Sequence, residues 1–173
     1  GASNCAPSRA SLMTGKASPR HGIYTVGTSE RGKTKTRRII PTTNTIFLDE
    51  ENSTIGDLFQ QAGYITGTFG KWHLGNEPLN QGVNINVAGG KNGNPGKNGY
   101  FSPYNVPNIA DWLEGEYLPD RLTNEVIQFI TDNKENPFFA YLPYYTVHTP
   151  LLSKQEVIDK YLAMPNILSK SQA

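Results

Sequence analysis

Cysteine is almost absent from this sequence of 173 residues, which contains only Cys5. A single cysteine forms no disulfide within the chain, so the cysteine content leaves the redox compartment open. An excess of charge of one sign is missing too, because 16 basic and 15 acidic residues leave a net charge of +1. This balance gives no reason to expect a nucleic acid or an acidic membrane as a partner. No apolar run approaches the roughly 18 residues of a membrane-spanning helix, so we predict no membrane span.

Glycine and proline, in contrast, are abundant, with 17 and 12 copies. Together with a hydrophobic content of 36%, they indicate a chain that is rich in loops but folded. A chain of this length can bury about two thirds of its unfolded surface, which is enough for a core. Repeats and internal boundaries are not evident, so we predict one domain over residues 1–173. Because the chain begins with Gly1 and enters a motif within a few residues, we expect a piece of a longer protein.

The single cysteine lies beside a predicted helix that runs from Pro7 to Thr14. Pro7 suits the first turn of a helix, and Gly15 suits the left-handed residue that follows its end. Cys5 would then lie just ahead of the helix N-terminus, facing free backbone N–H groups, with Arg9 about one turn further on. This position suits a bound anion or a reactive thiol. A buried and inert cysteine is the alternative that position alone allows.

A second helix is predicted over residues 52–64, where Thr54 and Asp57 can form a capping box and Gly63 ends the helix. Its expected apolar face comprises Ile55, Leu58, Phe59 and Ala62. The segment Tyr64–Phe69 follows directly and has the β-branched and aromatic residues of a strand. A helix that leads directly into a strand is half of a βαβ unit, so we predict an α/β fold with a parallel sheet.

The same order of helix and strand recurs nearer the C-terminus. Residues 118–130 predict a helix, and residues 138–142 form a continuous apolar strand of the kind that is buried on both faces of a parallel sheet. A last amphipathic helix is predicted from Lys154 to Met164. The apolar residues expected to pack from these two helices are Leu122, Val126, Phe129 and Ile130, then Val157, Ile158, Tyr161 and Leu162.

Three basic side chains follow the ends of the two predicted strands. Lys71 and His73 come after the first strand, and His148 comes after the second. Ligands of open α/β sheets bind beyond the carboxyl ends of strands, so all three residues are placed for chemistry. Two residues apart in an extended stretch, Lys71 and His73 can leave the same face. A surface lysine and structural histidines are the alternative, and we interpret His21 as a loop residue rather than a ligand.

Two loop regions allow more than one interpretation. Residues 31–38 are densely basic and form either a solvated surface loop or a loop that attracts an anionic ligand. Residues 76–107 are rich in Gly, Asn and Pro, and we interpret them as a flexible excursion. The alternative is the wall of a substrate cleft. In that case Tyr100, Phe101, Tyr104 and Trp112 could stack on sugar rings.

Three segments carry a resemblance to a known family. Cys-Ala-Pro-Ser-Arg at residues 5–9, continued by Ala-Ser-Leu-Met-Thr-Gly, resembles the active-site signature of the type I, formylglycine-dependent sulfatases. Phe-Gly-Lys-Trp-His-Leu-Gly at residues 69–75 resembles the second signature, and Phe-Phe-Ala-Tyr-Leu followed by His-Thr-Pro at 148–150 resembles the third active-site segment. The resemblance implies an alkaline-phosphatase-like, mostly parallel mixed sheet flanked by helices, of which residues 1–173 are the central part of the catalytic domain, truncated at both ends.

The resemblance implies a sulfuric ester hydrolase that cleaves sulfate from a sulfated carbohydrate or an aryl ester. In this family a maturation enzyme oxidises the cysteine to formylglycine, whose hydrate attacks sulfur and gives a covalent sulfo-enzyme intermediate. Cys5 would be that residue, and Arg9 and Lys71 would hold its oxygens and the sulfate. His73 would take the proton that drives sulfate release. His148 would bind sulfate or protonate the leaving oxygen.

The resemblance also implies a divalent cation, usually calcium, against the sulfate and the formylglycine at Cys5. The family's paired aspartates should precede Cys5, and an Asp-Asn pair and a second lysine should follow the His-Thr-Pro segment. The remaining ligands are therefore expected outside this chain, and we expect the chain alone to bind metal poorly and to turn over slowly or not at all. A periplasmic or secreted location is implied by the resemblance.

Two other functions stay open at this stage. The first is a phosphoesterase or phosphonate hydrolase of the same superfamily, because phosphate and sulfate esters differ mainly in charge. The second is a non-catalytic module that binds anions through the basic residues 31–38. The substrate alcohol, the linkage that is cleaved and the choice between exo and endo action do not follow from the sequence.

Overall fold

The structure, a computed structural model, describes residues 2–30, 32–75 and 77–165. Three strands form a sheet in the order β2-β1-β3, with β1 (Ile65–Phe69) between β2 (Ile85–Val87) and β3 (Phe138–Tyr141). Both pairings are parallel, and Gly67 of β1 is the partner of Ile85 and of Ala140. The predicted parallel sheet is therefore confirmed, and the carboxyl ends of all three strands meet at one edge.

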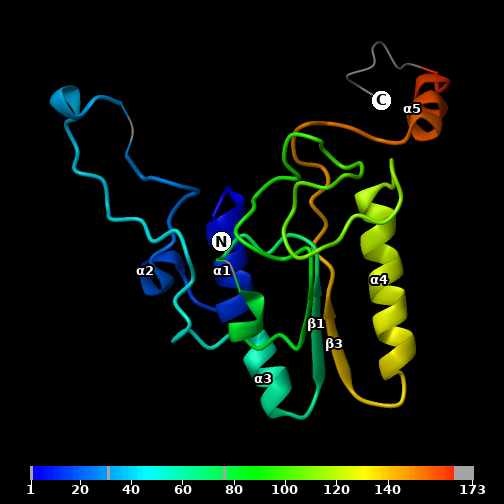
Figure 1. The fold of residues 1–173 in the computed structure, drawn as a ribbon. Helices are drawn as coiled ribbons and strands as arrows, with labels where there is room; N and C mark the ends of the chain where they lie inside the picture. Colours follow the sequence, from blue (N-terminus) through cyan, green and yellow to red (C-terminus); the bar gives the residue numbers. More distant parts are fainter. Residues whose placement is uncertain (1, 31, 76, 166–173) are drawn as a thin grey trace.

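Helices cover both faces of this sheet (Figure 1). In chain order the helices are α1 (Cys5–Thr14), α2 (Ser18–His21), α3 (Ile55–Gln61), α4 (Leu118–Asn133) and α5 (Gln155–Leu162), with the short 3-10 helices η1 (Thr34–Thr36) and η2 (Pro78–Asn80). In Figure 1, α1, α2 and α3 lie to the left of the strands, α4 lies to the right, and α5 lies apart above α4. Such a layered arrangement is typical of an α/β fold.

The helix α1 begins at Cys5 and not at Pro7, so Cys5 is the first residue of the helix rather than a residue ahead of it. Proline is tolerated throughout the first turn, because the first N–H groups have no acceptor within the helix. Asn4 is the N-cap residue with extended backbone. Gly15 ends the helix as predicted, with φ +66° and a hydrogen bond from its N–H to the carbonyl oxygen of Ser11 at 2.9 Å.

The predicted capping box of α3 is confirmed, but its predicted apolar face is wrong in part. The Thr54 hydroxyl accepts a bond from the Asp57 N–H, and the Asp57 carboxylate accepts one from the Thr54 N–H. Leu58, however, is 60% exposed, and Ala62 is exposed as well. The buried position of α3 is Gly56, where an added Cβ would lie 2.5 Å from the carbonyl oxygen of Gly82. This close approach of two backbones turns Leu58 outward.

The helix α4 begins at Leu118 as predicted and extends three residues beyond the predicted end, to Asn133. Leu122, Val126 and Phe129 are buried, and Phe129 packs on Phe69 of β1 with ring centroids 5.2 Å apart. Ile130 is 40% exposed, contrary to the prediction. Consecutive helical residues point about 100° apart, so Ile130 cannot share the direction of Phe129.

Two predictions about burial near the C-terminus are wrong. Each residue of β3 is only half-buried, because β3 lies at an edge of the described sheet. The helix α5 contains no buried residue, although Val157, Ile158, Tyr161 and Leu162 were expected to pack. It lies apart from the sheet, where the apolar side of an amphipathic helix finds no strand to cover (Figure 1). Residues 166–173, at the end of the chain, lie outside the described residues.

Residues 77–107 are not a flexible excursion, and that interpretation is wrong. They contain η2 and the strand β2, and Ala88, Gly89 and Gly90 are buried. Backbone hydrogen bonds fix this segment, including Gly70 N–H to the Val87 carbonyl at 2.8 Å and Ala88 N–H to the Asn108 carbonyl at 2.9 Å. Asn76, the first residue of the predicted loop, lies outside the described residues. The segment is thus a fixed wall at the carboxyl edge of the sheet.

Candidate active site

The N-terminal turn of α1 supplies two of the predicted site residues. Cys5 is half-buried at the first position of the helix, where backbone N–H groups are free of helical acceptors. Arg9 lies one turn further on, and its Nη1 donates to the carbonyl oxygen of Lys71 at 2.5 Å and to the hydroxyl of Tyr141 at 3.2 Å. The guanidinium therefore joins α1 to the residues that end β1 and β3.

The segment that follows β1 divides its side chains between the core and the site. Trp72 and Leu74 are buried and pack with the apolar side of α1, which comprises Ala6, Ala10 and Met13. Lys71 and His73 do not belong to this core, and Lys71 lowers the pKa of His73, so the two side chains lie near one another as the sequence predicts. The Lys71 N–H donates to the Pro143 carbonyl at 2.8 Å, which fixes this turn beside β3.

Lys71 is a buried cation, with 4% of its surface exposed. Burial lowers the pKa of its ammonium group, and the neighbouring Arg9 acts in the same direction. The charge of Cys5 and a hydrogen bond to its side chain act against burial and raise the pKa of Lys71. Cys5 and Arg9 are therefore both near enough to Lys71 to change its pKa, and the three side chains form one group.

His73 is held in an unusual backbone conformation at the centre of the site. Its φ of 61° is in the left-handed region, which costs free energy for a residue other than glycine. Its N–H donates to the Gly90 carbonyl at 2.8 Å. Gly93 lies against the imidazole, because an added Cβ there would be 2.6 Å from Nε2. The glycine-rich segment is therefore one wall of the His73 site.

The imidazole of His73 is neutral at pH 7. Burial, together with the nearby Lys71, Arg9 and His148, lowers its pKa to about 4. In the part of the chain that the structure describes, the buried Nδ1 of His73 has no hydrogen-bond partner. A buried polar atom without a partner costs free energy, and such atoms concentrate at functional sites.

His148 reaches the site from the turn that follows β3. Its N–H donates to the Tyr145 carbonyl at 3.0 Å, and its Nδ1 lies 2.9 Å from the Thr149 carbonyl oxygen. The residue is exposed, yet it is near enough to lower the pKa of His73. The structure thus brings together Cys5, Arg9, Lys71, His73 and His148, the five predicted site residues.

Tyr141 is a site residue that the sequence pattern did not reveal. It was predicted only as part of an apolar strand, but it ends β3 and its hydroxyl accepts the bond from Arg9. Burial raises its pKa, so the phenol stays protonated at pH 7 and can donate in turn. A hydroxyl on the last residue of a strand beside a predicted site was the available signal.

His21 is not a loop residue, contrary to the prediction, and its role is structural. It ends α2 and is buried, with Nδ1 accepting from the Ile23 N–H at 3.1 Å and Nε2 lying 3.2 Å from the Ser11 hydroxyl. Burial lowers the pKa of His21; its backbone hydrogen bond raises it, and the charge of Lys16 lowers it. Both ring nitrogens are satisfied, and the ring links α2 to α1.

The basic segment near residue 35 is a surface loop. Arg31 lies outside the described residues, and Lys33, Lys35 and Arg38 are exposed. The segment around η1 extends away from the sheet at the upper left of Figure 1. Arg37 forms an ion pair with Glu30 at 3.4 Å. These observations agree with the interpretation of a solvated loop and place its charges away from Cys5.

The described residues do not form a metal site by themselves. Among residues 2–30, 32–75 and 77–165, no group of three or more His, Cys, Asp or Glu side chains could hold a metal ion. Calcium requires several oxygen ligands, chiefly carboxylates, and the five predicted site residues offer none. No described helix is both long and apolar enough to cross a membrane.

The fold and the site together define an α/β protein with basic side chains grouped near a cysteine at a helix N-terminus. The sulfatase family model matches residues 1–169. A sulfatase of Formosa agariphila is 30% identical over 95% of this chain and 38% of its own length. The chain therefore belongs to the sulfatase family, and it spans less than two fifths of that relative.

Two solved structures have the same fold. The crystal structure of Ps i-CgsB in complex with k-i-k-neocarrahexaose is 26% identical, with a TM-score of 0.65 over 96% of this chain and 39% of that chain. A second structure, solved with its substrate D-glucosamine-2-N, 6-O-disulfate, is 25% identical, with a TM-score of 0.65 over 93% of this chain and 28% of that chain. The predicted sulfatase-like α/β fold is confirmed.

Proposed function

We propose that the protein to which this chain belongs hydrolyses sulfate esters, and that residues 1–173 are part of its single catalytic domain. The observation that carries this proposal is the grouping of Arg9 and Lys71 near Cys5 at the N-terminus of α1, where Arg9 donates to the Lys71 carbonyl and the charge of Cys5 raises the pKa of Lys71. Preorganised cations and backbone N–H groups stabilise a transferring anionic group in its transition state. Membership of the sulfatase family supports sulfate as that group.

Arg9 and Lys71 are fixed for this role before any ligand binds. Two hydrogen bonds orient the guanidinium of Arg9, and burial restricts Lys71. Cations that need not reorganise during the reaction stabilise developing charge more effectively than mobile ones. We infer that these two side chains hold the sulfuryl oxygens and the oxygens of the matured residue at position 5.

His73 and His148 are the groups that move protons. His73 is neutral at pH 7, so it can accept a proton in the step that releases sulfate. His148 lies on the exposed side of the site, where it can bind sulfate or donate a proton to the leaving oxygen. Oxidation of Cys5 to formylglycine by a maturation enzyme would supply a hydrated aldehyde, with one hydroxyl to attack sulfur and another to expel sulfate.

Calcium is the cation that we propose for the complete protein, on the family resemblance alone. Its ligands would come from outside the described residues, since these offer no cluster of three donors. No step above depends on it. The isolated chain is accordingly proposed to bind metal poorly and to turn over slowly or not at all. A periplasmic or secreted location is proposed on the same resemblance.

A sulfated sugar is the substrate class that we propose. One structural neighbour was solved with D-glucosamine-2-N, 6-O-disulfate as its substrate, and another with k-i-k-neocarrahexaose. Of the four aromatic residues considered for stacking, Trp112 is exposed, whereas Tyr100 is buried. An aryl sulfate is the convenient first test substrate, because its turnover needs no sugar recognition.

The test compares matched aryl sulfate and aryl phosphate esters on the full-length protein, expressed together with a maturation enzyme. We expect the larger kcat/KM for the sulfate, and the Cys5→Ala variant should lose about a thousandfold or more. Leu12→Ala, an exposed position on the same helix, is the matched control and should retain full activity. A larger kcat/KM for the phosphate would establish a phosphoesterase, and binding of sulfate esters without turnover would establish an anion-binding module.

A further inference from the structure

Tyr100 is a buried tyrosine whose hydroxyl contacts the turn that carries His148. It is 1% exposed, and its hydroxyl donates to the His148 carbonyl at 2.6 Å and, more weakly, to the Tyr145 carbonyl at 3.1 Å. Burial raises the pKa of Tyr100 and the charge of Tyr117 adds to this, whereas the bond to His148 lowers it. The hydroxyl is therefore a neutral donor throughout the neutral pH range.

The turn held by Tyr100 has few other internal bonds. The His148 N–H bonds to the Tyr145 carbonyl at 3.0 Å, so the backbone closes on itself between these two residues. The Tyr145 hydroxyl donates to the Ala88 carbonyl at 2.9 Å, which fixes the first residue of the turn to the segment after β2. Among the described residues, the His148 carbonyl accepts its hydrogen bond from Tyr100, and this bond fixes the last residue of the turn.

The backbone around Tyr100 is itself fixed to α4. Its carbonyl accepts from the Leu118 N–H at 2.7 Å, at the first residue of that helix. On its other side, Gly99 allows Leu152 to pack where a Cβ would stand. Lys154 further forms an ion pair with Asp120 in the first turn of α4. Tyr100 and Lys154 are thus both bonded to the N-terminal end of α4. The Tyr100 hydroxyl links this end of the helix to the turn that carries His148.

We propose that Tyr100 is a positioning residue for His148 in sulfate ester hydrolysis. This inference rests on the proposed function. Tyr100 touches no reacting group, and it acts through the main chain of His148. The bond from its hydroxyl fixes the position of the turn. It thereby sets the distance of the His148 imidazole from Lys71 and His73. Displacement of a catalytic group by about 1 Å can cost up to a hundredfold in rate.

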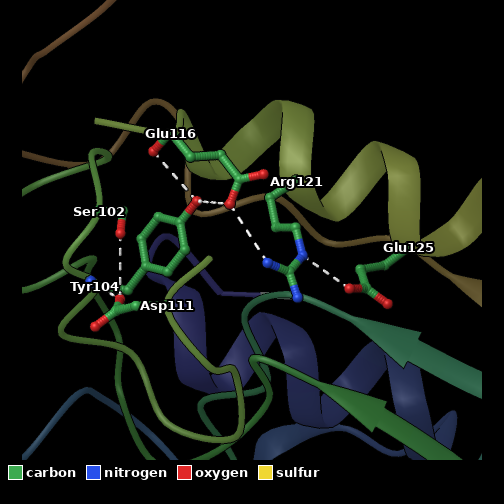
Figure 2. Close-up of polar contacts among 6 residues, drawn as sticks. All are labelled: Ser102, Tyr104, Asp111, Glu116, Arg121 and Glu125. Carbon is green, nitrogen blue, oxygen red and sulfur yellow. Dashed lines mark hydrogen bonds and ion pairs between the residues drawn. The ribbon is translucent and has the colours of Figure 1, made fainter. Parts of the chain in front are cut away.

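The variant Tyr100→Phe removes one oxygen and keeps the ring that fills the core. Tyr104→Phe is the matched control, because Tyr104 is a neighbouring tyrosine whose hydroxyl donates to Glu116, at 2.9 Å to the carboxylate and 3.2 Å to the carbonyl. Figure 2 shows that this second hydroxyl is linked through Glu116 to Arg121 and Glu125 of α4. Asp111 accepts from the backbone N–H of Tyr104 and from the Ser102 hydroxyl in the same figure. Both variants lose a tyrosine hydroxyl bond, and only the first touches His148.

A double-mutant cycle on the full-length, matured protein separates positioning from general loosening. In the wild-type background we expect Tyr100→Phe to lower kcat/KM for a sulfate ester about tenfold. In the His148→Ala background the same change should lower it less than about twofold, because the residue through which Tyr100 acts is gone. Tyr104→Phe should cost less than about twofold in either background. An equal loss from Tyr100→Phe in both backgrounds would overturn the proposal, as would no loss in the wild type.

A second readout does not require turnover. With 13C at Cε1 of histidine, the His148 signal, assigned through His148→Ala, should shift in Tyr100→Phe and stay in place in Tyr104→Phe, while the His21 signal stays in place in both. An unchanged His148 signal in folded Tyr100→Phe would overturn the proposal even in a protein without sulfatase activity. If Tyr100→Phe fails to fold, 3-fluorotyrosine at position 100, a stronger donor of the same shape, should shift the His148 signal, and an unchanged signal would overturn it.

Discussion

His21 is buried and His73 is half-buried near α1, and desolvation lowers the pKa of each, yet their surroundings are opposite. His21 uses both ring nitrogens in hydrogen bonds within the protein. His73 has a buried Nδ1 without a partner in the described residues, a left-handed backbone and two cations, Lys71 and Arg9, nearby. A ring whose two nitrogens are both hydrogen-bonded stabilises the fold. A buried ring nitrogen without a partner, on a residue with a left-handed backbone, costs free energy, and we infer that such a residue has a functional role. Burial alone therefore does not distinguish a structural histidine from a functional one.

The largest effect is expected at the His73 side of this comparison. His73→Leu should lower kcat of the full-length protein by about a hundredfold to ten thousandfold, because the proposed proton acceptor is lost. The melting temperature should stay the same or rise, since an apolar side chain leaves no buried nitrogen unpaired. Steady-state kinetics and thermal unfolding measure the two effects. A variant that is destabilised but fully active would contradict the assignment.

Arg9→Lys should produce the next largest loss, of about a hundredfold in kcat/KM. Lysine keeps the charge, but its ammonium group does not take the position of Nη1, which donates to both the Lys71 carbonyl and the Tyr141 hydroxyl. Arg20→Lys, an exposed arginine outside the pocket, is the matched control and should leave kcat/KM unchanged. If charge alone mattered, Arg9→Lys would behave as that control does.

Gly93→Ala should lower kcat/KM by about tenfold without a comparable loss of stability. The added methyl group would overlap the His73 imidazole and displace it, and such a displacement costs rate more than folding free energy. Gly27→Ala is the control, because nothing lies within 4 Å of an added Cβ there, although φ is +68°. A fully active Gly93→Ala protein would show that the wall beside His73 does not fix the ring.

The smallest effect on activity, and the clearest on stability, belongs to His21. Because burial lowers its pKa below the ordinary value of 6.5, the unfolded chain binds this proton first, and stability should fall as the pH is lowered below about 6.5. His21→Asn keeps an acceptor near Nδ1 without the titration, so its loss of stability below that pH should be smaller. The change should cost about 1–3 kcal/mol at pH 7 and leave kcat unchanged. Denaturant unfolding at several pH values measures this, and identical pH slopes would contradict it.

Features that depend on residues adjacent in the sequence could be predicted from the sequence alone. The capping box of Thr54 and Asp57 and the glycine end of α1 are local rules, and both are present. The placement of Lys71, His73 and His148 needed only the order of strands and the rule that sites lie at their carboxyl ends. The approach of these residues to Cys5 did not follow from that rule and was implied by the family resemblance.

Contacts between distant segments could not be predicted in this way. The strand β2 has three residues in a glycine-rich stretch, and it exists because it pairs with β1. The exposure of Leu58 follows from the approach of Gly56 to Gly82, which no local pattern encodes. Tyr100 was interpreted as a stacking or packing aromatic, and its bond to His148, 48 positions away, depends on the whole fold.

The chemical state of residue 5 in the full-length protein from its native source tests the central claim most directly. Peptide mass spectrometry distinguishes the cysteine thiol from the lighter formylglycine aldehyde in the tryptic peptide that contains position 5. The account predicts the aldehyde, and the Cys5→Ala protein supplies the matched peptide that cannot be converted. A native protein that carries only the thiol and still hydrolyses sulfate esters would contradict the account.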